Sequence, residues 1–298
     1  MGFENIIGNK DLHEMLKNSI SSTCLLHSYL FVGIEGIGKC LTAKEFARLI
    51  LNDNDDDKNN LELINHPDFM FITPDDGKSI KIDQIRLLQE KILEKPIVSS
   101  KKVYVIDNAD VMTKESQNCL LKTLEDPPEY AVIILVTSNE NKLLTTIKSR
   151  CTKLYFLPLS QNDLLTYFTV NHLDKPSDNL LKLSCGSISK AIQMQNEKET
   201  YENIDFIFEN IEKNDILEVW QNSNIIYQSK NIIFDLLEYI NLILFNRIKE
   251  TNDLRYANCI YITEQTKQRL LSNANFDMCI DNLLLKIWEE FHEEYSWS

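Results

Sequence analysis

The chain has 298 residues, of which 43% are hydrophobic and 26% charged, and its formal net charge at pH 7 is −14. This composition is typical of a globular protein with two or three domains. The acidic excess argues against a dominant DNA-gripping surface, because binding of nucleic-acid phosphates needs basic residues. It does not exclude contact with DNA by one face of a larger assembly.

The seven cysteines are scattered and include no Cys-x-x-Cys pair. An odd number without regular spacing indicates free thiols in a reducing cytoplasm, and it provides no zinc site. We expect no secretory signal, because the N-terminus lacks a basic segment followed by an apolar run. The longest apolar runs, such as AVIILV at residues 131–136, are too short to span a bilayer, so no membrane association is expected.

In chain order, five short segments rich in β-branched and aromatic residues are predicted to be strands. They are residues 28–33, 68–73, 102–107, 131–137 and 153–157. Helical patterns between them cover residues 39–51, 82–93 and 113–128. The last of these begins at Thr113, a favourable N-cap, and ends at Pro127 and Pro128. Continuously apolar strands that alternate with helices predict an α/β fold, with a parallel sheet covered by helices on both faces.

Two further features of the sequence bear on its division into domains. The polar stretch NDNDDDKNN at residues 52–60 is predicted to be a solvated surface loop. After about residue 158 the chain becomes purely helical, and from about residue 206 it reads as long amphipathic helices. We therefore predict an α/β domain at residues 1–158, a small helical domain at 159–205 and an all-α C-terminal domain at 206–298.

The stretch GIEGIGKC at residues 33–40 fits the phosphate-binding pattern G-x-x-x-x-G-K-[ST] everywhere except its last residue. Gly33, Gly36 and Gly38 allow backbone N–H groups to converge on phosphate oxygens at a helix N-terminus, and Lys39 adds a positive charge. A predicted strand precedes the loop and a predicted helix follows it, as the motif requires. The loop therefore predicts binding of ATP or ADP, and the alternative is a loop retained for its shape.

Two residues argue against hydrolysis of that nucleotide. Cys40 stands where the motif has a hydroxyl that binds Mg²⁺, and a soft thiol is a poor ligand for this hard cation. Asp107, at the end of the strand VYVID, could orient Mg²⁺, but Asn108 follows it where many such ATPases carry a glutamate that activates water. Loss of a general base costs ~10²–10⁴ in rate. Asp110 is the alternative base, or else a residue that starts a helix. We expect weak Mg²⁺ binding and no intrinsic ATPase activity.

In combination, these motifs resemble the bacterial clamp-loader branch of the AAA+ ATPases, which belongs to DNA polymerase III. The resemblance rests on GIEGIGK, IKIDQIR, VYVIDNADVMTKESQNCLLKTLEDPP and TTIKSRC followed by LPLS, and it covers residues 3 to about 192. The Asp-Asn-Ala-Asp motif and the altered phosphate loop favour the delta-prime type of subunit over the catalytic gamma/tau type. The resemblance implies an AAA+ nucleotide-binding fold, followed by a helical lid and a C-terminal collar that assembles a ring.

The resemblance also implies partners. Clamp loaders are rings of five subunits, here gamma/tau and delta beside this chain, which open a sliding clamp and place it on primed DNA. They work in the cytoplasm as part of a DNA-directed DNA polymerase holoenzyme, a nucleotidyltransferase complex. Arg150, within Ser149-Arg150-Cys151, matches the arginine that reaches the ATP of an adjacent subunit. Such an arginine is worth ~10³–10⁵ in phosphoryl transfer. The alternative for Arg150 is an ion pair with a local carboxylate.

Other residues take their roles only from the resemblance. Ile7, within the segment FENIIGN at residues 3–9, matches the part of the family that contacts adenine. Ser138 and Asn139 follow a predicted strand where the family has a residue that senses the γ-phosphate, and the sequence does not decide between them. Lys190 matches a second sensor position, at which active members usually carry arginine.

One feature of the family is missing. Its delta-prime and gamma members usually carry a four-cysteine zinc module after the phosphate-loop helix, whereas this chain has the acidic stretch 52–60 there. We therefore expect no zinc, and a structural role for His66. Three hypotheses remain: a catalytically silent ring subunit, a gamma-like ATPase with an atypical site, and an unrelated phosphate-loop enzyme such as a small-molecule kinase. The third is disfavoured, because a kinase has no evident use for the SRC motif and the long helical C-terminal region.

Overall fold

The computed structural model describes residues 2–22, 24–52, 63–75, 77–209, 211–213 and 215–292. The chain divides into two compact units, of which the first comprises Met1–His172 and Gly186–Ser189. The second comprises Leu173–Cys185 and Lys190–Ser298. The predicted acidic loop at 52–60 lies outside the described residues apart from its first residue, Asn52. The predicted division into three domains stays a prediction.

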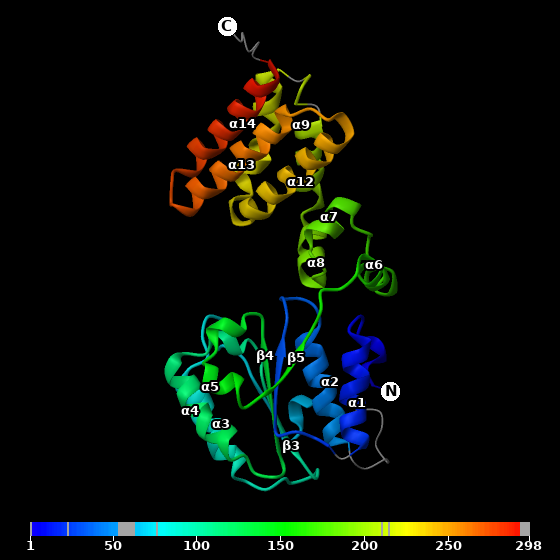
Figure 1. Cartoon of the computed structure of the whole chain (residues 1–298), viewed down its shortest axis with the longest axis vertical. Helices are drawn as coiled ribbons and strands as arrows, with labels where there is room; N and C mark the ends of the chain where they lie inside the picture. Colours follow the sequence, from blue (N-terminus) through cyan, green and yellow to red (C-terminus); the bar gives the residue numbers. More distant parts are fainter. Residues whose placement is uncertain are drawn as a thin grey trace. The chain divides into compact units, whose positions relative to one another are not determined.

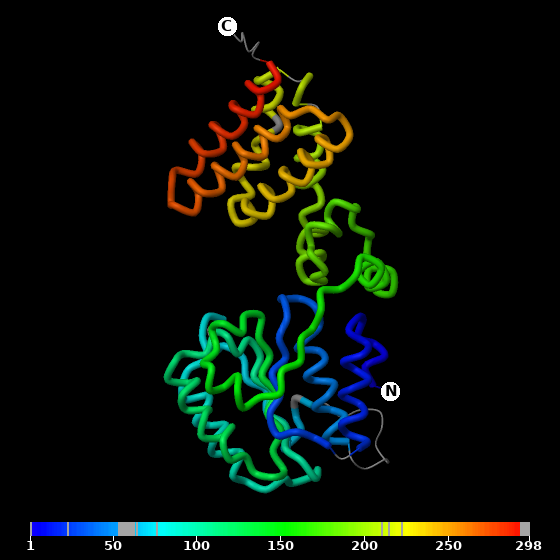
Figure 2. Tube along the Cα trace, in the orientation of Figure 1, coloured from blue at the N-terminus to red at the C-terminus, as the bar shows by residue number. Residues whose placement is uncertain are grey.

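The first unit contains a parallel five-stranded sheet in the order β2-β3-β4-β1-β5. Figure 1 draws the sheet with its helices, and Figure 2 traces the same chain as a tube. The strands are β1 (Ser28–Val32), β2 (Phe69–Ile72), β3 (Lys102–Ile106), β4 (Ala131–Thr137) and β5 (Thr152–Tyr155). The α-helices of this unit are α1 (Lys10–Ser21), α2 (Lys39–Leu51), α3 (Ile82–Ile92), α4 (Lys114–Glu125), α5 (Thr145–Lys148) and α6 (Gln161–Val170). Its 3-10 helices are η1 (Phe3–Asn5), η2 (Leu63–Asn65), η3 (Ala109–Val111) and η4 (Glu140–Lys142).

Helices cover both faces of the sheet, with α1 and α2 on one side and α3, α4 and α5 on the other (Figure 1). Successive strand residues point to opposite faces, so each strand supplies side chains to two cores. Leu30 of β1 packs in a buried cluster with Ile85 and Leu88 of α3. On the opposite face, the Tyr29 ring packs edge-on against the Phe46 ring of α2 with 5.3 Å between their centroids. The predicted fold class is confirmed.

The local signals for these elements are confirmed closely. All five predicted strands form, and their ends differ from the predicted ones by no more than two residues. Thr113 is the N-cap of α4, where its Oγ1 accepts a hydrogen bond from the Ser116 backbone N–H at 3.2 Å. The helix ends at Glu125, two residues before Pro127, because proline cannot continue a helix.

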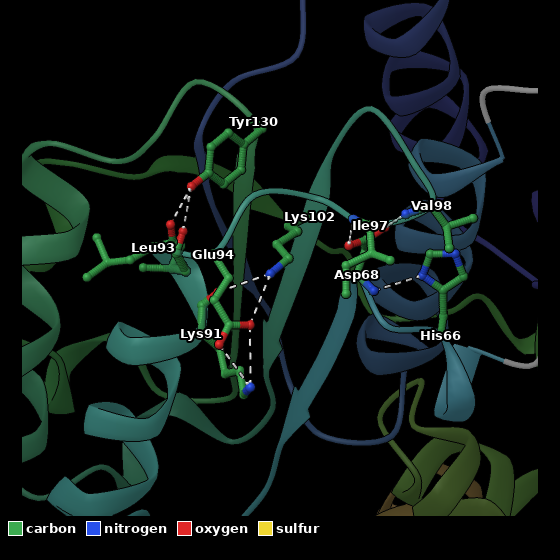
Figure 3. Close-up of polar contacts among 10 residues, drawn as sticks. His66, Asp68, Lys91, Leu93, Glu94, Ile97, Val98, Lys102 and Tyr130 are labelled. Carbon is green, nitrogen blue, oxygen red and sulfur yellow. Dashed lines mark hydrogen bonds and ion pairs between the residues drawn. The ribbon is translucent and has the colours of Figure 1, made fainter.

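The connection from α3 to β3 is held at both of its ends (Figure 3). The buried carboxylate of Asp68 accepts hydrogen bonds from the backbone N–H groups of Ile97, Val98 and Ser99 at 2.7, 2.7 and 2.9 Å. Burial alone would raise the pKa of Asp68, but these three donors outweigh it and lower the pKa. His66, which the sequence predicts to be structural, accepts from the Asp68 backbone N–H through Nδ1 at 3.1 Å.

The other end of this connection is held through the C-terminal carbonyl groups of α3. The buried Lys102 donates from Nζ to the Lys91 carbonyl oxygen at 3.1 Å. The Tyr130 hydroxyl donates to the carbonyl oxygens of Ile92 and Leu93 at 3.0 and 3.2 Å. These bonds satisfy acceptors that the end of a helix leaves without intrahelical partners. The start of β3 and the end of α3 are therefore fixed to each other.

The second unit is entirely helical within its described residues. Its helices are α7 (Asp178–Leu183), α8 (Ile188–Asn196, whose first two residues belong to the first unit), α9 (Lys198–Glu209), α10 (Ile216–Asn222), α11 (Asn224–Gln228), α12 (Ile233–Thr251), α13 (Arg255–Leu271) and α14 (Phe276–His292), with the 3-10 helix η5 (Lys230–Ile232). One buried apolar cluster joins them. The Tyr239 hydroxyl donates to Asp205 at 2.9 Å. No helix in the described part of the chain combines the length and apolar character that crossing a membrane requires.

Candidate functional site

The phosphate loop, residues 33–38, joins the end of β1 to the start of α2. Gly33 opens it, and Gly36 and Gly38 have φ angles of +78° and +89°, in the left-handed region that glycine adopts without strain. Gly38 is the N-cap of α2, so the first backbone N–H groups of that helix lack intrahelical partners beside the loop. This backbone fits a phosphate group, because a helix N-terminus carries partial positive charge.

Lys39, the cation of the motif, is turned toward its own loop. Its side chain is buried, and Nζ donates to the carbonyl oxygen of Ile34 at 2.5 Å. Burial lowers the pKa of Lys39, and the negative charges of Asp107 and Glu35 oppose that shift. Binding of a phosphate by Lys39 therefore requires that the contact with Ile34 is exchanged.

Cys40 and Asp107 meet at the loop, as the motif requires of these two positions. Burial and, after it, the adjacent Asp107 carboxylate, which also accepts a hydrogen bond from the thiol, raise the pKa of Cys40 to about 12. The thiol therefore stays protonated at neutral pH, and a neutral thiol is not a ligand for Mg²⁺. The residues present fit a nucleotide phosphate, but Cys40 does not fit the metal that accompanies it in active enzymes. The role of Asp107 as an oxygen ligand for Mg²⁺ stays a prediction.

The carboxylate of Asp110 is occupied by its neighbours. It accepts hydrogen bonds from Thr137 Oγ1 at 2.9 Å and from the backbone N and Oγ of Ser138 at 3.2 and 3.4 Å. Asp110 lies in η3, so these bonds tie the segment after β3 to the end of β4. This arrangement favours the structural interpretation of Asp110 over that of a general base. Asn108, exposed and in the left-handed region, supplies no base either.

Ser138 and Asn139 are both engaged within the chain. Ser138 binds Asp110 as described above, whereas the Asn139 side chain accepts from the Asn141 backbone N–H at 3.1 Å and caps η4. The Ser138 side chain is thus the one linked to the acidic motif at the carboxyl edge of the sheet. The sensing role of Ser138 stays a prediction.

A turn distant in the sequence, Gly186–Ser189, packs on the apex of the phosphate loop. The Ile188 backbone N–H donates to the Gly36 carbonyl oxygen at 2.9 Å. A Cβ atom on Gly36 would lie 2.3 Å from Ser187 Oγ, so glycine is required here by space as well as by φ. This contact was not predicted, because the sequence pointed only to Lys190, just beyond the turn.

Lys190 belongs to the second unit, where its Nζ forms ion pairs with Asp235 at 2.9 Å and Glu238 at 3.8 Å. Both carboxylates lie on α12. Ile7, at the start of the chain, is half-buried. The neighbouring Asn9 fixes this segment, because its side chain exchanges two hydrogen bonds with the backbone of Leu157 at 2.8 and 3.1 Å. The adenine-contacting and sensing roles of Ile7 and Lys190 stay predictions.

Arg150 lies on the surface beyond the end of α5. Its guanidinium donates to the Thr146 carbonyl oxygen at 3.0 Å and forms an ion pair with Glu125 at 2.6 Å. The two side chains are 33% and 52% exposed. The ion pair with a local carboxylate, which the sequence left open as an alternative, thus forms in the single chain. The Arg150 side chain stays partly exposed in this ion pair.

The sheet separates Arg150 from the phosphate loop of its own chain. Gly33, Asp107 and Ser138 directly follow the carboxyl ends of β1, β3 and β4, and parallel strands bring these ends to one edge. Arg150 instead precedes β5, whose Tyr155 is in register with Val32 at the end of β1. Five residues of strand rise correspond to roughly 16 Å. Arg150 is therefore beyond the reach of its own phosphate loop.

The structure thus brings Lys39, Cys40, Asp107, Asp110 and Ser138 together at the carboxyl edge and places Arg150 at the amino edge. Sequence reasoning missed the Glu125 partner of Arg150, because it lies 25 residues away on another helix. No group of three or more histidine, cysteine, aspartate or glutamate side chains could hold a metal ion, within the described ranges.

The parallel sheet, the glycine loop after its first strand and the acidic residue after β3 define a phosphate-loop protein of the AAA+ type. The profile of the family described as DNA polymerase III, delta subunit, matches residues 8–160, which is just over half of the chain. The chain belongs to this family. The predicted resemblance to the clamp-loader branch is confirmed at this level.

Among curated relatives, DNA polymerase III subunit delta′ of Bacillus subtilis (strain 168) is 34% identical over 194 residues, which are 62% of this chain and 59% of the relative. DNA polymerase III subunit gamma/tau of Mycoplasma genitalium is 30% identical over 97% of this chain and 54% of the relative. The chain thus spans little more than half the length of these relatives. A gamma subunit-related protein of Thermotoga maritima aligns over 93% of this chain and 99% of that one, with a TM-score of 0.48 and 19% identity.

Proposed function

We propose that this chain is a delta-prime type subunit of a DNA polymerase III clamp loader. In this proposal it forms a pentameric ring with gamma/tau and delta subunits, which loads a sliding clamp on primed DNA in the cytoplasm. It does not hydrolyse ATP itself but donates Arg150 to the ATP site of a neighbour. In this proposal residues 1–158 form the AAA+ base, residues 159–205 the helical lid and residues 206–298 the collar.

The position of Arg150 carries this proposal. It is exposed, and it lies at the edge of the sheet opposite its own phosphate loop, so any phosphate it serves belongs to another chain. A guanidinium is always charged and binds phosphate oxygens with two parallel donors. Its ion pair with Glu125 is no obstacle, because exposed ion pairs contribute about 0–1 kcal/mol.

The state of the phosphate loop supports a silent subunit. Cys40 is a half-buried, protonated thiol in place of the hydroxyl that binds Mg²⁺. Asp110, the alternative base, is committed to Thr137 and Ser138. Both requirements of hydrolysis, a metal and a base, are thus weakened within one site. The glycine geometry is intact, so nucleotide binding without turnover remains part of the proposal.

One observation favours the second candidate, a gamma/tau-like ATPase. The relative that aligns over 97% of this chain is a gamma/tau subunit. Asp107 retains a half-exposed carboxylate at the end of β3, which is the position for a Mg²⁺ ligand. The two candidates differ in whether the isolated chain turns over ATP.

The isolated chain is expected to show no ATP turnover above a protein-free blank, because it lacks the hydroxyl ligand for Mg²⁺ at position 40 and a general base. Phosphate release measured with the chain alone and with a reconstituted complex of this chain, gamma/tau and delta checks this. The complex should hydrolyse ATP, and its rate should rise with primed DNA. Turnover by the chain alone at a rate comparable to that of the complex would favour the gamma/tau-like candidate.

Replacing Cys40 by serine is expected to create Mg²⁺-dependent nucleotide binding. The wild-type chain should bind ATP equally well with Mg²⁺ and with EDTA, whereas Cys40→Ser should bind severalfold more tightly with Mg²⁺, because a hydroxyl is a hard ligand. Isothermal titration calorimetry measures both affinities. Cys24→Ser, which changes an exposed thiol, is the control. If wild-type binding already depends on Mg²⁺ as strongly as that of Cys40→Ser, Cys40 is not the defect.

A further inference from the structure

The ion pair between Arg150 and Glu125 joins the ends of two helices. Glu125 is the last residue of α4, and Arg150 follows α5 by two residues. The guanidinium is held by two acceptors, the Glu125 carboxylate at 2.6 Å and the Thr146 carbonyl oxygen at 3.0 Å. Because both acceptors are on this chain, the guanidinium has a defined resting position in the free subunit.

Glu125 occupies a position at which a carboxylate does not help its own helix. The C-terminus of an α-helix carries partial negative charge, so an acidic side chain there is unfavourable. Helix stability therefore does not account for a glutamate as the last residue of α4, whereas the contact with Arg150 does. Asp126 follows directly, is also exposed, and makes no ion pair with a described residue. It provides a control with the same charge, one residue away.

We infer that Glu125 is a positioning residue. It binds Arg150 in the free subunit and competes for it with the phosphate of the neighbouring ATP. The inference rests on the proposed function for the identity of that phosphate. The ion pair holds the long Arg150 side chain in one place without burying it. Pairing reduces the apparent affinity of the interface for ATP, because only subunits in which Arg150 is unpaired are competent to bind the phosphate. Exposed ion pairs set that factor at up to about fivefold.

The first test uses the isolated full-length chain and phenylglyoxal, a reagent that modifies arginine. The rate of modification of Arg150, followed by mass spectrometry, is expected to rise by up to about fivefold in Glu125→Gln, because its guanidinium is no longer paired. In Asp126→Asn it should equal the wild-type rate. Circular dichroism checks that all three proteins are folded. An unchanged rate in Glu125→Gln, or an equal rise in both variants, overturns the inference.

The second test uses the complex reconstituted with gamma/tau and delta subunits and primed DNA. With Glu125→Gln, the KM for ATP is expected to fall by up to about fivefold while kcat stays the same, since only the competition for Arg150 is removed. Asp126→Asn should leave both constants unchanged. An unchanged KM, in a complex whose rate Arg150→Ala still reduces, overturns the inference. If Arg150→Ala does not change the ATPase rate while phenylglyoxal modification is faster in Glu125→Gln, the proposed function fails, but the binding of Arg150 by Glu125 is confirmed.

Discussion

Replacing Arg150 by alanine is expected to abolish DNA-stimulated hydrolysis at the neighbouring site that it serves, with a loss of ~10³–10⁵ at that site. The physical reason is that the guanidinium stabilises charge on the transferred phosphoryl group. The variant should fold normally, because the side chain is exposed and its ion pair with Glu125 contributes little to stability. ATPase rates of the reconstituted complex provide the measurement.

A matched control is Lys148→Ala, which removes a cation at the end of the same short helix, α5. Its complex should hydrolyse ATP at the wild-type rate. Size-exclusion chromatography must show that the Arg150→Ala subunit still enters the ring, so that a lost rate reports chemistry and not assembly. A complex that contains Arg150→Ala and hydrolyses ATP normally would remove the central element of the proposed function.

Replacing Asp68 by asparagine is expected to destabilise the first unit by about 3 kcal/mol, the largest effect on stability that we predict. The carboxylate is buried and accepts three backbone N–H bonds, and hydrogen bonds to a buried charge are stronger than neutral ones. An amide has one acceptor oxygen instead of two, so at least one of these N–H groups loses its partner. Urea unfolding at pH 7 measures the loss, with exposed Asp126→Asn as the neutral control.

The effect of Asp68 should depend on pH in a defined direction. The pKa of Asp68 is lowered in the folded protein. The stability that its carboxylate contributes is therefore fully present above the unfolded pKa, which is near 3.9. The contribution is lost as the pH falls through the lower, folded value. The stability difference between wild type and Asp68→Asn should therefore be constant from pH 7 to about pH 5 and shrink below about pH 4. A difference that grows on acidification would show that the carboxylate is not held as described.

The fold was predictable to the extent that its signals are local. Strands and helices were located from runs of apolar residues, and the Thr113 cap and Pro127 stop were readable because each acts on its own helix. The meeting of Cys40 with Asp107 was predictable from topology, since both follow parallel strands whose carboxyl ends share an edge. Local periodicity and the predicted parallel sheet thus located the nucleotide-binding half of the candidate site.

What the sequence did not predict depends on contacts between distant segments. The sequence leaves open whether Asp110 is a base or a residue that starts a helix, and its bonds to Thr137 and Ser138, 27 and 28 residues away, favour a structural role. The sequence did not predict Glu125 as the partner of Arg150, because the pattern around Glu125 indicates only the end of a helix. In each case the polar side chain is satisfied by a tertiary neighbour, and periodicity carries no information about such pairs.

The turn Gly186–Ser189 determines which fragments of this protein keep an intact phosphate loop. Its four residues complete the first unit, although the chain on either side belongs to the second, so the polypeptide passes between the units after residues 172, 185 and 189. A fragment cut at His172 would keep every strand of the sheet, yet it would strip the Gly36 carbonyl and the Leu159 amide of their bonds to this turn. Nucleotide affinities measured on such a fragment would be those of an altered phosphate loop. A fragment that preserves the loop must include the turn, joined through a short engineered linker.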